Sequence, residues 1–109
     1  MTKELREQLT FITKGVLQTV PDSEAIYLFG SYAYGTPDNE SDMDIYVVVP
    51  DSLQEHPIDI AVAIRKNIIN QHNIAMDILV GKSSVFSRRK NAPTLENTVA
   101  EQGVIIYAS

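Results

Sequence analysis

The alternation of apolar and polar residues predicts where the helices of this chain lie. Between residues 3 and 20, apolar side chains recur at helical spacing, at Leu5, Leu9, Ile12, Val16 and Leu17. This pattern predicts an amphipathic helix over 3–20, with Thr2 as its N-cap. A broad apolar face predicts a second long helix from Pro57 to about Asn70, and shorter helices are expected over 85–90 and 94–101.

Short apolar runs between these segments indicate strands. They cover residues 25–29, 42–49 and 73–80, and a short extended segment follows Gly103 at 104–107. Gly81 is expected to end the third strand. The order is helix, strand, short helix, strand, helix, strand and then C-terminal helices. It predicts an α/β domain in which helices pack on a small central sheet. A chain of 109 residues is expected to be a single domain over 1–109.

The polar residues at 30–44 are the first candidates for function. Gly30 and Ser31 end the first strand, and Asp42 and Asp44 open the second. Strand residues two apart point to the same face, so these carboxylates repel one another unless a cation, a proton or a donor neutralises them. A glycine after a strand lets backbone N–H groups approach a phosphate, and Ser31 adds a hydroxyl donor. Taken separately, the pair also fits a solvated strand edge, and Gly-Ser also fits a simple tight turn.

Asp77 adds a third carboxylate and is expected to lie centrally in the apolar third strand, where aspartate is depleted. If the second and third strands are neighbours, Asp77 stands beside Asp42 and Asp44. Three carboxylates in a partly apolar setting need a counter-charge, and one or two divalent cations supply it. Mg²⁺ suits the site, because proteins usually hold it with one or two carboxylates and substrate phosphates. Two such ions, about 4 Å apart, would activate an attacking oxygen and stabilise a leaving pyrophosphate.

Composition excludes several classes of protein. The net charge of −5 disfavours direct binding to nucleic acid, which depends on phosphate neutralisation by Lys and Arg. The sequence has no cysteine, which excludes disulfides and thiolate zinc sites. No apolar run approaches the roughly 20 residues that span a bilayer, and the start of the chain lacks the apolar core of a signal peptide. We therefore expect a cytoplasmic protein with no membrane contact.

The spacing of these residues resembles a known family. Gly30-Ser31, ten further residues and Asp42-x-Asp44 give the pattern GSx10DxD of the minimal nucleotidyltransferases, in the DNA polymerase β-like superfamily. Ser41 and Asp77 also match, as does the ending LENTVAEQGVIIY. The resemblance implies a nucleotidyltransferase fold with a mixed sheet. It also implies catalytic and Mg²⁺-binding roles for Asp42, Asp44 and Asp77, and ATP-binding roles for Gly30, Ser31 and Ser41.

The resemblance implies a partner as well. Small members of this family commonly act as antitoxins, which transfer AMP from ATP to a tyrosine of a HEPN-domain ribonuclease toxin and so silence it. A hetero-oligomer with such a toxin is therefore expected. Two alternatives stay open. One is nucleotidyl transfer to a small molecule such as an aminoglycoside, or to nucleic acid, although so short a chain leaves little room for an acceptor domain. The other is a non-enzymatic antitoxin that neutralises its toxin by contact.

Overall fold

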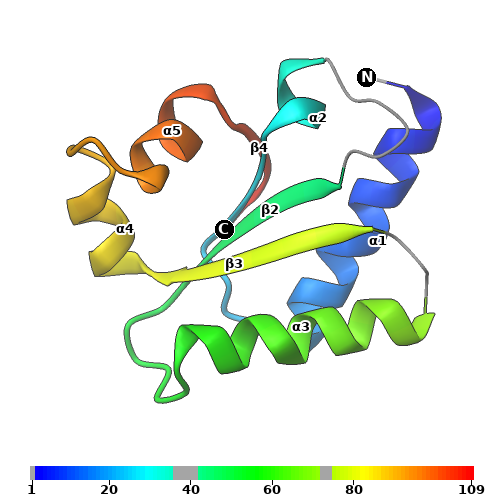
Figure 1. The fold of residues 1–109 in the computed structure, drawn as a ribbon. Coiled ribbons are helices and arrows are strands. Elements are labelled where there is room, and N and C mark those ends of the chain that lie inside the picture. Colours follow the sequence, from blue (N-terminus) through cyan, green and yellow to red (C-terminus); the bar gives the residue numbers. More distant parts are fainter. Residues whose placement is uncertain (1, 36–41, 72–74) are drawn as a thin grey trace.

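The computed structural model confirms the α/β class and the order of the predicted elements (Figure 1). The structure describes residues 2–35, 42–71 and 75–109. Along the chain the elements are α1 (Lys3–Thr19), β1 (Ala25–Phe29), α2 (Ser31–Tyr34), β2 (Met43–Val49), α3 (Pro57–Gln71), β3 (Met76–Lys82), α4 (Ser83–Arg89), α5 (Leu95–Gln102) and β4 (Val104–Ala108). Helix α1 begins as predicted, because the Thr2 hydroxyl accepts a hydrogen bond from the Leu5 N–H at 3.1 Å. None of the described helices is both long and apolar enough to cross a bilayer.

The four strands form one mixed sheet in the order β3-β2-β1-β4. Strand β1 is antiparallel to both β2 and β4, whereas β2 and β3 are parallel. Helix α3 makes the crossover that a parallel pair requires. The segment after Gly103 extends further than its sequence suggested, because it pairs with β1 and becomes a fourth strand of the sheet.

Alternation along the strands gives the sheet two different faces. One face packs on α1 and α3, and its largest fully buried side chains include Ile26, Leu28, Ile45 and Val47. The opposite face is aromatic and carries a smaller buried cluster that includes Phe29, Tyr46, Val48, Phe86 and Val99. Because α4 and α5 supply the last two of these residues, these helices cover only part of that second face (Figure 1).

A polar link fixes α4 and α5 on the aromatic face. The Tyr46 hydroxyl donates to Glu96 Oε2 at 3.0 Å, and Arg89 Nε donates to Glu96 Oε1 at 2.9 Å. Burial, reinforced by the hydrogen bond to Glu96, raises the pKa of Tyr46, so its hydroxyl stays protonated as a donor. Gly81 leaves room for this side chain, since a Cβ there would lie 2.0 Å from the Tyr46 hydroxyl oxygen. The link therefore holds α4 and α5 over one end of the aromatic face, and the candidate site lies at the other end.

The bounds of β2 and β3 differ from the prediction. Strand β2 begins at Met43, so Asp42 directly precedes it. Strand β3 begins at Met76 and continues through Gly81, whose backbone is in register with Val48, to Lys82. The predicted start of that strand, at residues 73 and 74, lies outside the described residues. Gly81 therefore serves close packing inside a strand rather than ending it.

Candidate active site

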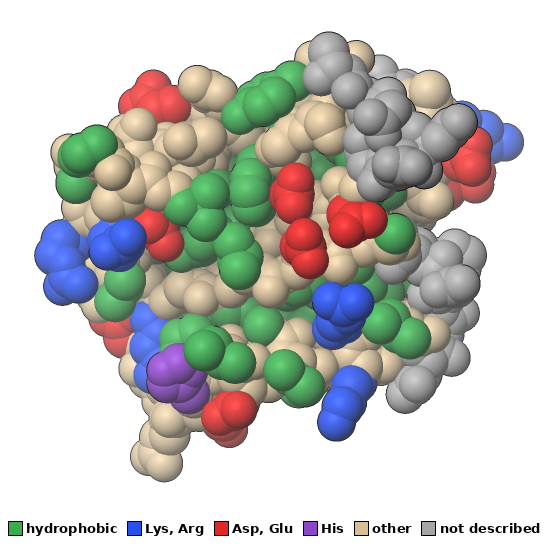
Figure 2. All heavy atoms as spheres, in the orientation of Figure 1, with side chains coloured by type: hydrophobic (Ala, Val, Ile, Leu, Met, Phe, Trp, Pro, Cys, Tyr) green, Lys and Arg blue, Asp and Glu red, His purple; other side chains and the backbone are tan. Residues whose placement is uncertain are grey.

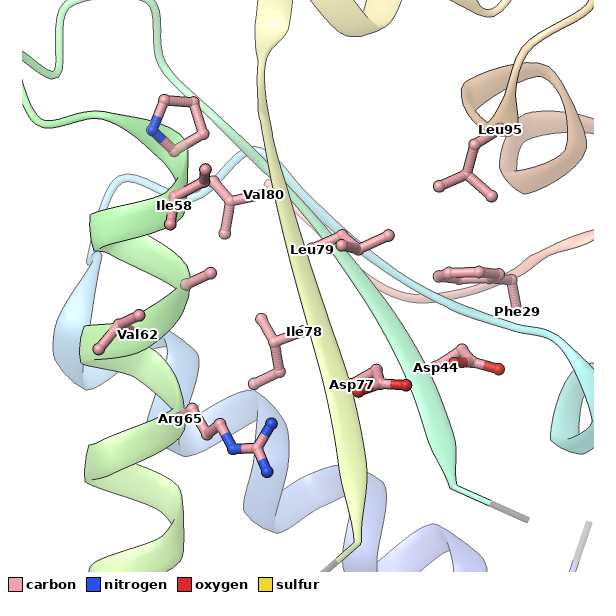
Figure 3. A pocket seen from close by; sticks show the side chains of 12 residues that line it. Phe29, Asp44, Ile58, Val62, Arg65, Asp77, Ile78, Leu79, Val80 and Leu95 are labelled. Carbon is pink, nitrogen blue, oxygen red and sulfur yellow. The ribbon is translucent and has the colours of Figure 1, made fainter.

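Three side chains stand in one row across the sheet. Phe29 on β1 is in register with Asp44 on β2, and Asp44 is in register with Asp77 on β3. The neighbouring strands that the sequence argument assumed are therefore present, and the two carboxylates stand side by side (Figure 3). The predicted central position of Asp77 is wrong, however. It is the second residue of β3 and is exposed, because the strand starts later than its apolar run suggested.

Asp44 is the aspartate of this site whose ionised form is disfavoured. Its side chain is half-buried. Burial, together with the nearby charges of Asp77 and Asp42, raises the pKa of Asp44 above its ordinary value. Each cause acts by disfavouring the ionised form, the first by removing water and the others by like-charge repulsion. The other two predicted carboxylates therefore act on Asp44, and a cation bound beside it would offset their repulsion.

Gly30 lies directly against Asp44. Its φ of 75° and ψ of −157° fall in a region that is open to glycine and strained for other residues. A Cβ at Gly30 would lie 2.2 Å from Asp44 Oδ2, so the carboxylate occupies the space that any side chain would take. The short helix α2 starts at the next residue, Ser31, and the Gly30 carbonyl accepts from the N–H groups of Ala33 and Tyr34. The fold thus brings the predicted phosphate turn and the predicted metal ligands together.

The donor set suits a hard divalent cation. No three acidic or histidine side chains in the described part of the chain are close enough to hold an ion by themselves. Mg²⁺ does not need such a cage, because it usually takes one or two carboxylates and completes its shell with water and substrate phosphate oxygens. Asp44 and Asp77, with Asp42 just before β2, fit that requirement. Ser41, the other predicted nucleotide-binding residue, lies outside the described residues.

Two of the four basic residues over 82–90 make contacts within the fold. Lys82 Nζ donates a hydrogen bond to the Leu53 carbonyl. Arg89 forms an ion pair with Glu96 at 2.9 Å. Arg88 and Lys90 are exposed. None of these four cations is among the residues that line the pocket containing Asp44 and Asp77.

That pocket has a volume of about 550 Å³ and is largely apolar. Figure 2 shows the setting on the surface, where acidic side chains gather over the starts of β2 and β3 with apolar side chains beside them. Besides the two aspartates, the lining includes Phe29, Arg65 and Leu95, which the sequence analysis did not single out (Figure 3). In the sequence, only the broad apolar face of α3 indicated part of this pocket. Periodicity alone does not tell which apolar residues of that face stay uncovered.

Comparisons with known proteins give the family and the fold. Residues 13–109 match the family described as polymerase beta, nucleotidyltransferase. No curated protein matches the chain in sequence.

Solved structures share the fold. A protein from Sulfolobus solfataricus that is described as a nucleotidyltransferase has a TM-score of 0.64 and 22% identity, over 93% of this chain and 78% of that one. A toxin–antitoxin structure with AMP-PNP has a TM-score of 0.62 and 23% identity, over 93% and 73%. A chain in the complex of a tri-AMPylated Shewanella oneidensis HEPN toxin with an MNT antitoxin has a TM-score of 0.61 and 21% identity, over 99% and 74%. At these identities the likeness establishes the fold.

Proposed function

Because the chain belongs to the polymerase β-type nucleotidyltransferase family, we propose that it transfers AMP from ATP to a tyrosine of a HEPN-type toxin and acts as the antitoxin of that pair. The observation that carries the proposal is the register of Asp44 and Asp77 across parallel strands, with the Gly30 turn against Asp44. Further support comes from the fold, which resembles structures of a toxin–antitoxin with AMP-PNP and of an AMPylated HEPN toxin with its antitoxin.

The nucleotide would lie on the Gly30 side of the carboxylates. The turn at Gly30 and Ser31 carries no bulky side chain next to Asp44, so its backbone N–H groups and the Ser31 hydroxyl are suited to phosphate oxygens. Ser41 is proposed to assist them. Asp42, Asp44 and Asp77 would hold Mg²⁺, which supplies positive charge to the triphosphate and to the leaving pyrophosphate. The unrelieved charge around Asp44 is what makes this set receptive to a cation.

The reaction is an in-line displacement at the α-phosphorus of ATP. The tyrosine oxygen forms a bond to that phosphorus, while the bond from phosphorus to the oxygen bridging the β-phosphate breaks and pyrophosphate leaves. Asp77 is exposed at the pocket, and in this proposal its carboxylate favours deprotonation of the attacking hydroxyl, either directly or through the metal. The product is a phosphodiester that links the tyrosine oxygen to adenosine. The protein contributes mainly position and charge.

The proposal is tested with a candidate HEPN-domain toxin. The two proteins are incubated with Mg²⁺ and ATP labelled at the α-phosphate, and the modified residue is located by peptide mass mapping. We expect AMP on a tyrosine of the partner and loss of its ribonuclease activity. Inhibition of the partner without label would favour a non-enzymatic antitoxin. Label on an added aminoglycoside, with none on the partner, would favour a small-molecule acceptor.

A further inference from the structure

An apolar groove leads away from the catalytic aspartates, between α3 and β3. Here it is called the α3–β3 groove. Its lining from the helix includes Ile58, Ala61, Val62 and Arg65, and its lining from the strand includes Leu79 and Val80 (Figure 3). Asp44 and Asp77 line the same cavity. The groove is therefore continuous with the place where the reaction would occur.

Helix α3 carries more apolar surface than the core uses. Its inner stripe consists of Ile60, Ile64 and Ile68, which are exposed by only 4%, 0% and 1%. A second stripe consists of Ile58, Val62 and Ile69, which are exposed by 67%, 47% and 43%. One stripe is enough to dock an amphipathic helix on a core. An exposed apolar patch beside an active site is typical of a surface that binds a ligand or a partner protein.

Strand β3 brings this apolar surface up to the carboxylates. Within the described part of the chain it pairs only with β2, so it is an edge strand. Asp77 and Leu79 are two residues apart and both exposed, so they share one face of the strand. Ile78 and Val80 face α3 instead, so the cavity passes around the edge of β3 and joins the apolar surface of α3 to the aspartates. The backbone along a free strand edge can also pair with an extended peptide.

The shape of the groove favours a protein segment over a small molecule. A small-molecule pocket usually buries about 70–90% of its ligand, but Ile58, at one wall of this groove, is itself two-thirds exposed. A wall this exposed suits an apolar occupant that is longer than a small molecule.

Its charge disfavours two other acceptors. Arg65 is the only cation among the described residues that line the cavity, and it projects from α3 beside β3 (Figure 3). A nucleic acid would need several cations to neutralise its phosphates. A polycationic aminoglycoside would find an apolar wall with an arginine in place of further carboxylates.

We propose that the α3–β3 groove is the acceptor-binding surface, which takes an extended, apolar segment of a partner protein. The segment lies beside β3, and a hydroxyl on it reaches Asp44 and Asp77. Its apolar side chains cover Ile58, Val62 and Leu79. This inference rests on the proposed function for the identity of the reacting hydroxyl, whereas the binding surface itself can be tested without any transfer.

The experiment measures binding of two labelled ten-residue peptides in the presence of Mg²⁺ and a non-hydrolysable ATP analogue. One peptide carries a tyrosine between alternating leucine and valine residues, with lysines at both ends for solubility. The other has serine in place of leucine and valine. The groove variants are Ile58→Glu and Val62→Glu. The matched control is Ile105→Glu, because Ile105 is a similarly exposed isoleucine, at 59%, on β4 and outside this cavity.

We expect the apolar peptide to bind the wild-type protein and Ile105→Glu equally, and each groove variant at least tenfold more weakly. The serine peptide should bind the wild-type protein at least tenfold more weakly than the apolar one. Affinity for the ATP analogue should be the same in all variants. Equal binding of the apolar peptide to wild type and groove variants, equal binding of the two peptides, or no binding of either would overturn the proposal. Transfer of AMP to the peptide tyrosine is scored separately and bears on the proposed function.

Discussion

Asp44 on β2 and Asp77 on β3 are register partners in a parallel strand pair, so two carboxylates face the same side of the sheet next to each other. The pairing comes from the crossover through α3, which returns the chain parallel to β2. On the other flank of Asp44, Gly30 leaves the space that its carboxylate fills. Two like-charged carboxylates beside a glycine turn do not favour stability. They are, however, well suited to binding a cation and a phosphate.

Two glycines with positive φ allow a comparative test of this arrangement. Gly30 and Gly35 have φ values of 75° and 77°, but their ψ values are −157° and 20°. A Cβ at Gly35 would meet none of the described residues within 4 Å. Gly35→Ala should therefore cost only the left-handed backbone strain, about 1 kcal/mol of unfolding free energy. Gly30→Ala should cost roughly 2–4 kcal/mol in urea unfolding, since its ψ lies in a region that essentially only glycine adopts and the new methyl group also displaces Asp44.

The same pair separates stability from catalysis. Gly30→Ala should lower the rate of AMP transfer by about 100-fold, because a small displacement of the Asp44 carboxylate is enough to misplace the reacting groups. Gly35→Ala should retain transfer close to the wild-type rate. Comparable transfer by both variants would show that the contact between Gly30 and Asp44 does not position the site.

Asp44→Asn should stabilise the protein while inactivating it. Because the pKa of Asp44 is raised in the folded state, its ionised form costs stability at neutral pH. In buffer with a chelator at pH 7, removing that charge should add about 0.5–1 kcal/mol to the free energy of unfolding. The gain should vanish below the ordinary aspartate pKa of 3.8, where Asp44 is protonated in both states. Transfer should fall on the order of 100-fold or more. A loss of stability at pH 7 would contradict the repulsion inferred at this site.

The response to metal is expected to differ between the wild-type protein and Asp44→Asn. A chelator should abolish AMP transfer, and added Mg²⁺ should restore it. Without nucleotide, millimolar Mg²⁺ should raise the melting temperature of the wild-type protein, because the ion binds the folded site and offsets the charge of Asp44. Asp44→Asn should show a smaller rise. An equal rise in both proteins would place the ion elsewhere.

Glu96 gives a pH prediction away from the site. Burial acts to raise the pKa of Glu96, but the hydrogen bonds from Arg89, from its own backbone and from Tyr46 together lower it. A lowered pKa stabilises the fold above the unfolded value of 4.5, and this contribution is lost as the pH falls through the folded-state pKa. Glu96→Gln should therefore cost about 1–2 kcal/mol at pH 7 and less at pH 3.

The control for this prediction is Glu101→Gln. Glu101 lies on the same helix and is exposed. Its replacement should change the free energy of unfolding by less than about 0.5 kcal/mol. A Glu96→Gln cost that is independent of pH would mean that packing, and not charge, holds this link together.

Local signals in the sequence were sufficient for much of the fold and the site. The Thr2 cap, the stripe of α1 and the carboxylates at strand starts depend on neighbours within a few residues. The sequence argument assumed that the second and third strands are neighbours, and their pairing brings Asp77 alongside Asp44. The GSx10DxD pattern then connected the turn to the carboxylates.

Long-range contacts account for what the sequence did not reveal. The link between Tyr46 and Glu96 joins residues 50 positions apart, and no local pattern marks it. The pairing of β4 with β1 likewise joins the end of the chain to its first strand. The start of β3 was misjudged because an apolar run does not show where pairing begins. The groove beside Arg65 depends on which stripe of α3 the core leaves uncovered, and only tertiary packing decides that.

We propose that this site transfers AMP to a tyrosine of a HEPN-type partner. The most direct measurement compares ATP labelled at the α-phosphate with ATP labelled at the γ-phosphate, using the wild-type protein and Asp77→Asn. Nucleotidyl transfer predicts label on the partner tyrosine from the α-labelled ATP alone, and at least about 100-fold less of it with Asp77→Asn. Label from the γ-phosphate, no label from either, or undiminished labelling by Asp77→Asn would contradict the account.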